Sequence, residues 1–354
     1  MRKEALTFLV LCAGLLINGC ATERRPRWAL SGGEPGEPTV ICRVQELSAE
    51  VKARLLALNP EQVTPEEVRD LLSQNPAPQV INIHGGILPI KTGMNSFTQF
   101  LIGMGYPEAS IRNPGDGSYT YGYYDDSDMI AGTIAWYYER DGLRPMLVGH
   151  SQGGIQAIRV LHKLAGDYGK KEAVWNPVTG KEENRYEITD PLTGGTRPVL
   201  GLQVSYATAA VAGGLARMLP NEWDMNSQLR KIPDSVEDFT GFQKGMDVLG
   251  GDFFGYGSAN DYYATGSAKV RNVRLPAASP HSTIPYTKGL LSSQAIRDWV
   301  SNYQRDGKGE TESGADPVNA QMLWAAEVWH DVKKHWVLEL QRLIRAQGRD
   351  HHNG

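Results

Sequence analysis

Residues 149–154, GHSQGG, constrain the fold of this chain more than any other segment, because they join two different periodicities. The apolar residues 146–148 before them predict a strand, whereas Ile155, Ile158 and Leu161 after them recur at helical spacing. A strand can turn directly into a helix where small residues flank the apex and let the two backbones approach. The segment therefore predicts a strand–turn–helix unit with Ser151 at its strained apex, exposed as a nucleophile near the positive end of a helix.

The rest of the chain alternates between short apolar runs and helical patterns. We expect helices at 95–104, 127–140, 152–165 and 318–346, and strands at 80–83, 110–112, 146–148, 199–206, 253–257 and 270–275. The last helix carries one apolar stripe, which is typical of a helix that faces a core. Strand and helix in alternation predict an α/β fold with a mostly parallel central sheet and helices on both faces.

Two segments interrupt the alternation. Residues 170–198 contain the turn sequences NPVTG and LTGG between short extended runs, which predict an inserted hairpin. Residues 212–250 lack a sheet pattern, so they form either a lid or a helical connection packed permanently on the sheet. A tyrosine-rich loop follows the strand expected at 110–112, and it either lines a pocket or simply packs a glycine-rich loop; its members are Tyr119, Tyr121, Tyr123 and Tyr124.

The GHSQGG segment and its setting resemble the α/β-hydrolase superfamily, in particular bacterial lipases and esterases, many of which carry a GHSxGG turn. The resemblance runs from Val80 to about His281, and it leaves the N-terminal tether, the hairpin and the last helix outside. It implies the α/β-hydrolase fold, a nucleophile–acid–histidine order along the chain, an oxyanion hole built partly from an earlier loop, and no cofactor.

Residues 84–86, HGG, follow the strand expected at 80–83 and resemble the oxyanion-loop turn of lipases. In that resemblance the backbone N–H of Gly86 (or Ile87) and the backbone N–H of Gln152 hold the oxyanion. A tight turn at the end of a strand would also explain the two glycines, but the nucleophile turn lies downstream in the order that the family requires.

The general base must be a histidine that follows Ser151, and His281 fits best. It comes shortly after the strand expected at 270–275, where this fold places its histidine, and Pro280 restricts the loop before it. The other candidates lie in the helix after the nucleophile, in the last helix or at the chain end: His162, His330, His335, His351 and His352.

The acid of the triad is expected at Asp261. Residues 257–261, GSAND, match the Gly-x-x-x-Asp turn that follows the preceding strand in the superfamily. Asp252 precedes the strand expected at 253–257 and would point to the wrong end of the sheet. Asp224 and Asp247 remain as alternatives.

The first nineteen residues predict a secretory signal, with a basic head and an apolar run at 6–17. Residues 16–20, LINGC, resemble a bacterial lipoprotein signal, although Asn18 departs from that pattern. The resemblance implies lipidation at Cys20, a membrane anchor, and an outer-membrane lipoprotein that faces the periplasm. Ordinary cleavage or a plain N-terminal anchor is the alternative, and a Cys20–Cys42 disulfide could then form. Residues 20–40 predict a flexible tether, and residues 41–354 the hydrolase domain.

Composition excludes other classes. A net charge of −4 leaves no basic field for nucleic acid, and the sequence shows no metal-binding cluster or nucleotide-binding loop. Together these features predict a serine carboxylester hydrolase, esterase- or lipase-like, that acts on a small-molecule or lipid ester. An acyltransferase, a thioester or amide hydrolase with the same triad, and a catalytically silent binding lipoprotein are the alternatives.

Overall fold

A computed structural model describes residues 44–86, 88–212, 214, 219–252, 258–305 and 319–350. Its central sheet has six strands in the order β12-β10-β8-β3-β1-β2, and every neighbouring pair is parallel. The strands are β1 (Val80–His84), β2 (Tyr121–Gly122), β3 (Met146–His150), β8 (Val204–Ala210), β10 (Val236–Lys244) and β12 (Lys269–Leu275). The expected α/β architecture with a mostly parallel sheet is thus confirmed.

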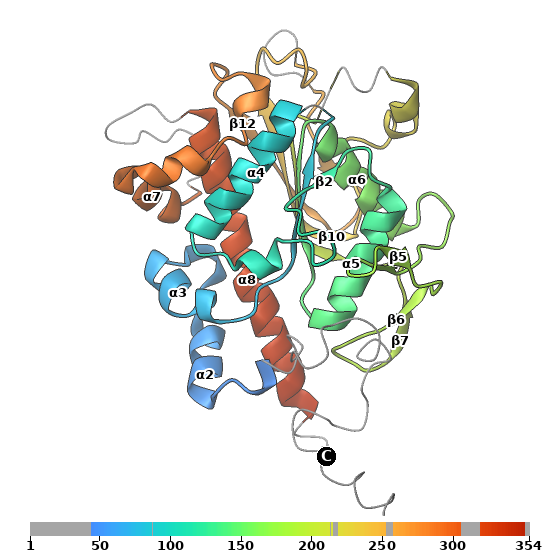
Figure 1. The fold of residues 1–354 in the computed structure, drawn as a ribbon, viewed down its shortest axis with the longest axis vertical. Helices are drawn as coiled ribbons and strands as arrows, with labels where there is room; N and C mark the ends of the chain where they lie inside the picture. The colour runs from blue at the N-terminus through green and yellow to red at the C-terminus, as the bar shows by residue number, and fades with distance from the viewer. Residues whose placement is uncertain are drawn as a thin grey trace, which may run out of the picture.

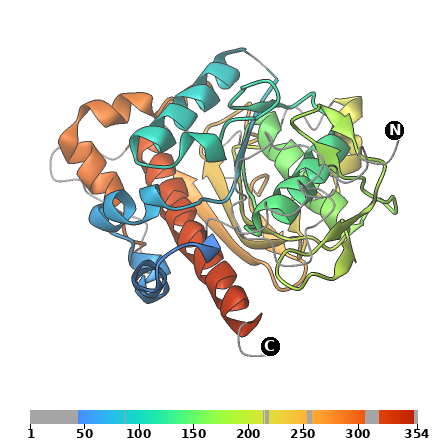
Figure 2. The same ribbon diagram turned by 60° about the horizontal axis from the view of Figure 1, so that its bottom comes forward.

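Helices cover both faces of this sheet (Figures 1 and 2). One face carries α5 (Ser127–Asp141) and α6 (Gln152–Ala165). The other carries α4 (Leu88–Gly103) and the long α8 (Ala320–Asp350), flanked by α2 (Ala49–Ala57), α3 (Pro65–Asp70) and α7 (Gln294–Ser301). The two-sided cover explains why β1, β3, β8 and β10 are buried along most of their length, whereas the edge strand β12 is partly exposed. No helix within the described ranges has both the length and the apolar content to cross a bilayer.

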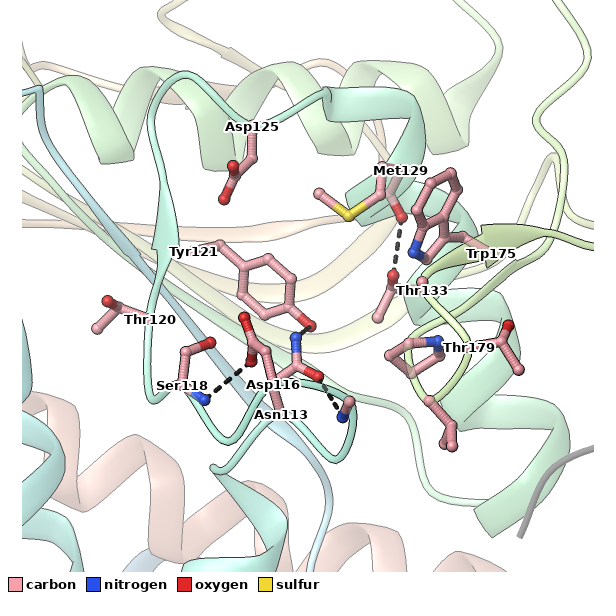
Figure 3. A pocket seen from close by; sticks show the side chains of 14 residues that line it. Asn113, Asp116, Ser118, Thr120, Tyr121, Asp125, Met129, Thr133, Trp175 and Thr179 are labelled. Atoms are coloured by element: carbon pink, nitrogen blue, oxygen red, sulfur yellow. Dashed lines mark hydrogen bonds between the residues drawn. The ribbon is translucent and has the colours of Figure 1, made fainter.

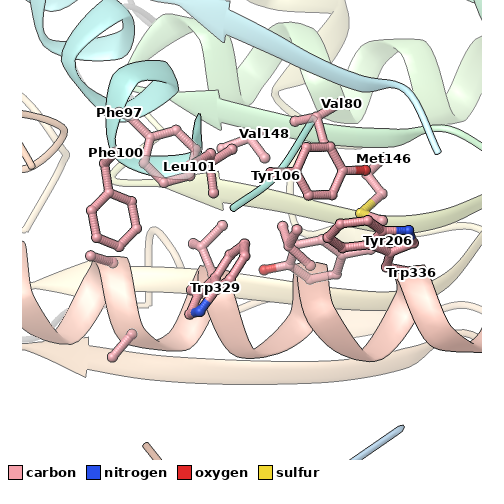
Figure 4. Close-up of a cluster of buried hydrophobic side chains, with 14 of the residues drawn as sticks. Val80, Phe97, Phe100, Leu101, Tyr106, Met146, Val148, Tyr206, Trp329 and Trp336 are labelled. Atoms are coloured by element: carbon pink, nitrogen blue, oxygen red, sulfur yellow. The ribbon is translucent and has the colours of Figure 1, made fainter. Parts of the chain in front are cut away.

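Aromatic side chains fill the layer between α4, α8 and the sheet (Figure 4). The Trp336 ring of α8 lies edge-on to Tyr106 with 4.8 Å between centroids, and its indole N–H donates to the Pro76 carbonyl at 2.8 Å. Phe97 of α4 packs against Trp324 of α8 at 4.4 Å. The apolar stripe seen in the sequence of the last helix therefore faces the core.

Strand β10 lies inside the segment 212–250, so the expectation that this segment lacks a strand is wrong. The strand carries polar side chains that are paired with α8 rather than with water: Asp238 binds Lys334 at 2.8 Å, and the Thr240 hydroxyl donates to Asp331 at 2.9 Å. These partners lie about ninety residues later in the chain. The sequence around β10 shows polar residues but not the distant side chains of α8 that pair with them, so its pattern does not indicate a buried strand.

The remaining departures concern short elements. Residues 170–198 form two small antiparallel hairpins instead of one: β4 (Trp175–Asn176) with β5 (Lys181–Glu182), and β6 (Glu187–Thr189) with β7 (Thr196–Pro198). No strand forms at 110–112, where a 3-10 helix, Glu108–Ser110, leads into the tyrosine-rich loop. The signal, the tether, Cys20, Cys42, Ile87 and the strand expected at 253–257 lie outside the described residues.

Candidate active site

Ser151 stands at the turn between β3 and α6, as the sequence predicted. Its backbone has φ 56° and ψ −130°, a conformation that is rare for a residue with a side chain. The turn is held by a hydrogen bond from the Ser151 N–H to the Ala210 carbonyl of β8 at 2.8 Å. Such strain persists only where the surrounding structure fixes the backbone, and it is concentrated at functional sites.

The glycines around Ser151 are required by close approach of backbones. A Cβ on Gly153 would lie 2.1 Å from the Ile83 carbonyl oxygen of β1, and a Cβ on Gly149 would lie 2.5 Å from the Gly153 carbonyl oxygen. Neither neighbour is a flexible side chain that could move aside. The small residues therefore let the start of α6 rest directly on the sheet.

Gly153→Ala is expected to destabilise the fold by about 2 kcal/mol or more, because the new methyl group meets backbone atoms on a central strand. Chemical denaturation followed by circular dichroism measures the change. Gly289→Ala is the matched control, since nothing lies within 4 Å of a Cβ at that position. Equal stability of the two variants would contradict the packing described here.

His281 lies beside the nucleophile. Its Nε2 is 2.9 Å from the Ser151 Oγ, and its Nδ1 is 2.7 Å from Oδ2 of Asp247. His281 follows β12 and Asp247 follows β10, while Ser151 follows β3. The carboxyl ends of parallel strands meet at one edge of a sheet, so three residues up to 130 positions apart come together.

Asp247 is enclosed on all sides, with 2% of its side chain exposed. Burial alone raises the pKa of its carboxyl. The hydrogen bond and charge of the His281 ring, with the Gly250 N–H donated to Oδ1 at 2.9 Å, outweigh that effect and bring the pKa below its ordinary value. Asp247 is therefore an ionised acceptor beside the imidazole.

The prediction that Asp261 partners the histidine is wrong. Its side chain is 54% exposed, and it lies 3.6 Å from Arg230 on the surface. Asp224 pairs with Arg159 at 3.2 Å, and Asp252 accepts from the Asn260 amide at 3.2 Å. Asp247, one of the alternatives, is the carboxylate that contacts His281. It follows β10, whereas the sequence pattern placed the acid after a strand expected at 253–257.

Two hydrogen bonds fix the loop after β1. The His84 Nδ1–H donates to the Gly85 carbonyl at 2.7 Å, and the next amide, the Gly86 N–H, donates to Oε1 of Gln152 at 3.1 Å. Because C=O and N–H point in opposite directions across a trans peptide, the first bond turns the Gly86 N–H toward the Gln152 side chain at the start of α6. The structure thus brings Gly86 and Gln152 together, and the Gln152 side chain engages the Gly86 amide.

His150 was not singled out by the sequence, yet it lies directly behind the site. Its ring is fully buried, with its centroid 5.2 Å from that of His281. Burial, with the neighbouring His281 charge, holds the pKa of His150 well below its usual value. Within the described chain neither ring nitrogen has a hydrogen-bond partner. A neutral imidazole here packs against His281 without adding charge.

Two other candidate histidines, His162 and His335, have partners away from Ser151. His162 binds Asp167 and two backbone carbonyls, and His335 stacks on Tyr206 at 5.6 Å. Over the described ranges no group of three or more His, Cys, Asp or Glu side chains is arranged to hold a metal ion.

What the fold and site define together is a parallel α/β sheet with a Ser–His–Asp hydrogen-bonded chain at its carboxyl edge. The chain matches no protein-family model and no curated protein.

Proposed function

We propose that this protein is a serine hydrolase of the α/β-hydrolase type that cleaves carboxylic esters. The proposal rests on one observation, the continuous chain from Asp247 through His281 to the Oγ of Ser151, which stands on a strained turn. The strands that precede the three residues support it, since Ser151, Asp247 and His281 follow β3, β10 and β12 of one sheet, in the chain order that the superfamily resemblance implies.

The reaction follows from the contacts. His281 Nε2 takes the Ser151 proton as Oγ attacks the ester carbonyl, and Asp247 holds the Nδ1–H and stabilises the imidazolium. The Gln152 backbone N–H, at the start of α6, and an amide of the loop at 84–87 stabilise the oxyanion. His281 then protonates the leaving alcohol. Water attacks the acyl-enzyme in the second half and releases the acid.

Exposed apolar side chains around the nucleophile favour an ester with an apolar acyl group. Leu88, the first residue of α4, is 75% exposed, and Tyr124, on the loop after β2, is 77% exposed. Met246, Val248 and Leu249 flank the buried Asp247 and are each about half exposed or more. Large apolar residues gathered at one rim mark a surface for an apolar ligand. We therefore place lipid-like acyl esters ahead of small polar ones.

Labelling with a fluorophosphonate probe and a panel of p-nitrophenyl esters of increasing chain length test this function. We expect Ser151 to be labelled and the longer esters to be cleaved faster. No labelling of folded protein would favour a silent binding scaffold. Labelling without cleavage of any ester would favour an acyltransferase or a thioester or amide hydrolase.

The Gln152 side chain gives a test of the oxyanion site. Gln152→Glu keeps its shape but places a negative charge beside the Gly86 amide, where negative charge develops in the transition state. We expect kcat to fall about tenfold or more at pH 8, because the added negative charge opposes the charge that develops on the oxyanion. Gln152→Met, which adds no charge, separates this effect from loss of the hydrogen bond. Equal kcat for both variants would place the oxyanion elsewhere.

We also propose the bacterial envelope as the location, through a lipid on Cys20. The residue lies outside the described part of the chain, so the proposal rests on the LINGC sequence alone. Metabolic incorporation of labelled palmitate into the wild type but not into Cys20→Ser is the expected result. Equal incorporation into both proteins would contradict it.

A further inference from the structure

A cavity lies between two segments that the proposed reaction does not use, and its lining contains none of Ser151, Asp247 and His281. It has a volume of about 370 Å³ and lies between the tyrosine-rich loop, the first turns of α5 and the β4–β5 hairpin. Figure 3 shows the Tyr121 ring between the loop that carries Asp116 and the hairpin strand that carries Trp175, with Asp125 on the far side of the ring. The volume is within the range of small-molecule sites.

The walls of this cavity are fixed by backbone packing. A Cβ on Gly132 of α5 would lie 2.2 Å from the Ala173 carbonyl oxygen, so the hairpin rests directly on the helix. A Cβ on Gly115 would lie 2.1 Å from the Pro177 carbonyl oxygen, which ties the loop to the hairpin. Asn176 stiffens the hairpin turn by accepting from the Val178 N–H at 3.0 Å. A preformed cavity needs little ordering when a ligand enters.

The charged groups of the lining are all acidic. Asp116 accepts from the Ser118 N–H at 2.9 Å, and Asp125 accepts from the Gly122 N–H at 2.5 Å. Each bond anchors one oxygen and leaves the carboxylate a second oxygen to face a ligand. No Lys, Arg or His is among the described residues that line the cavity. The nearby Arg112 donates to the Gly117 carbonyl on the same loop.

The remaining lining is aromatic and hydroxylic. Trp175 and Tyr121 contribute ring surface, Met129 contributes a thioether, and the threonine and serine side chains contribute hydroxyl groups. The Tyr121 hydroxyl accepts from the Asn113 amide at 3.3 Å. Aromatic faces and carboxylates without a neighbouring cation attract an ammonium group, because the negative face of each ring and both carboxylates all attract a positive charge. An anionic ligand meets repulsion from both Asp116 and Asp125.

We propose that this cavity binds an organic ammonium ion carried on a short hydroxyl-bearing chain. The ammonium group lies against the Trp175 and Tyr121 rings, where the Asp116 and Asp125 carboxylates attract it from the lining, and its hydroxyl bonds to the threonine and serine side chains. The site is separate from Ser151 and does not depend on the proposed hydrolase activity.

Isothermal titration calorimetry with choline tests the site, using 3,3-dimethylbutan-1-ol as the uncharged ligand of the same shape. We expect saturable choline binding that weakens with added salt, and binding of the alcohol at least about tenfold weaker. Glucose serves as a neutral polyol. Absence of choline binding, or equal binding of the alcohol or of glucose, would overturn the proposal.

Variants locate the binding in this cavity. Asp116→Asn retains the bond to the Ser118 N–H, and we expect it to weaken choline binding about threefold or more. Trp175→Leu removes the ring and should weaken it further. The exposed Asp70→Asn, on α3, is the matched control and should bind as the wild type does. Ser151→Ala should also bind choline normally. Unchanged affinity in both Asp116→Asn and Trp175→Leu, with folding verified by circular dichroism, would exclude this cavity.

Discussion

Replacing Asp247 with asparagine is expected to lower kcat for ester hydrolysis by about 10⁴-fold. The carboxylate accepts the Nδ1–H of His281 at 2.7 Å and so leaves Nε2 without a proton, ready to accept one from Ser151. An asparagine amide can donate to Nδ1 instead, which favours the tautomer with its proton on Nε2. That imidazole cannot act as a base. Steady-state kinetics with a p-nitrophenyl ester measure the loss.

Asp261→Asn is the matched control, because the sequence alone favoured Asp261 for the same role. Its side chain is half exposed and lies near Arg230 on the surface, so we expect kcat within about twofold of the wild type. Thermal unfolding should show both variants folded. A large loss in Asp261→Asn with none in Asp247→Asn would mean that the contacts described for His281 are not those of the working enzyme.

Replacing Ser151 with alanine is expected to lower kcat by about 10⁶-fold and to abolish fluorophosphonate labelling. The change deletes only the Oγ, which lies 2.9 Å from His281 Nε2, and the backbone of the turn is held by its own hydrogen bond to Ala210. The positive φ at position 151 costs an alanine no more conformational energy than it costs a serine. The variant should therefore fold normally and still lack the nucleophile.

Intact-protein mass spectrometry after probe treatment shows whether the label is absent, and peptide mapping of the labelled wild type shows where it is attached. A label on any residue other than Ser151, or ester hydrolysis by Ser151→Ala near the wild-type rate, would contradict the proposed nucleophile. Circular dichroism of both proteins excludes unfolding as the cause of a lost label.

The sequence predicted the elements whose signals are local. Helix α6 has the predicted bounds, because Ser151 precedes its first residue, Gly166 follows its last, and its apolar residues recur at helical spacing. The contact of His281 with Ser151 was also predictable, since each follows an apolar strand and the carboxyl ends of parallel strands coincide. Here the local pattern and the tertiary arrangement agree.

The acid could not be placed by the same reasoning, because its strand is stabilised from a distance. Along β10, Asp238 and Thr240 are buried only because Lys334, His335 and Asp331 of α8 pair with them. Without α8 the stretch has the polarity of a loop. Had β10 been identified, Asp247, three residues after its end, would have been the first candidate.

Helix α8 has a consequence for how this protein matures. It is translated after every residue of the proposed triad, yet it covers one face of the sheet together with α4 and pairs with the charged side chains of β10. A nascent chain that ends before residue 320 carries Ser151, Asp247 and His281 but leaves the part of that face over β10 uncovered. The sheet is thus completed only once α8 has been made, so a product that ends before residue 320 lacks the cover that the charged side chains of β10 require.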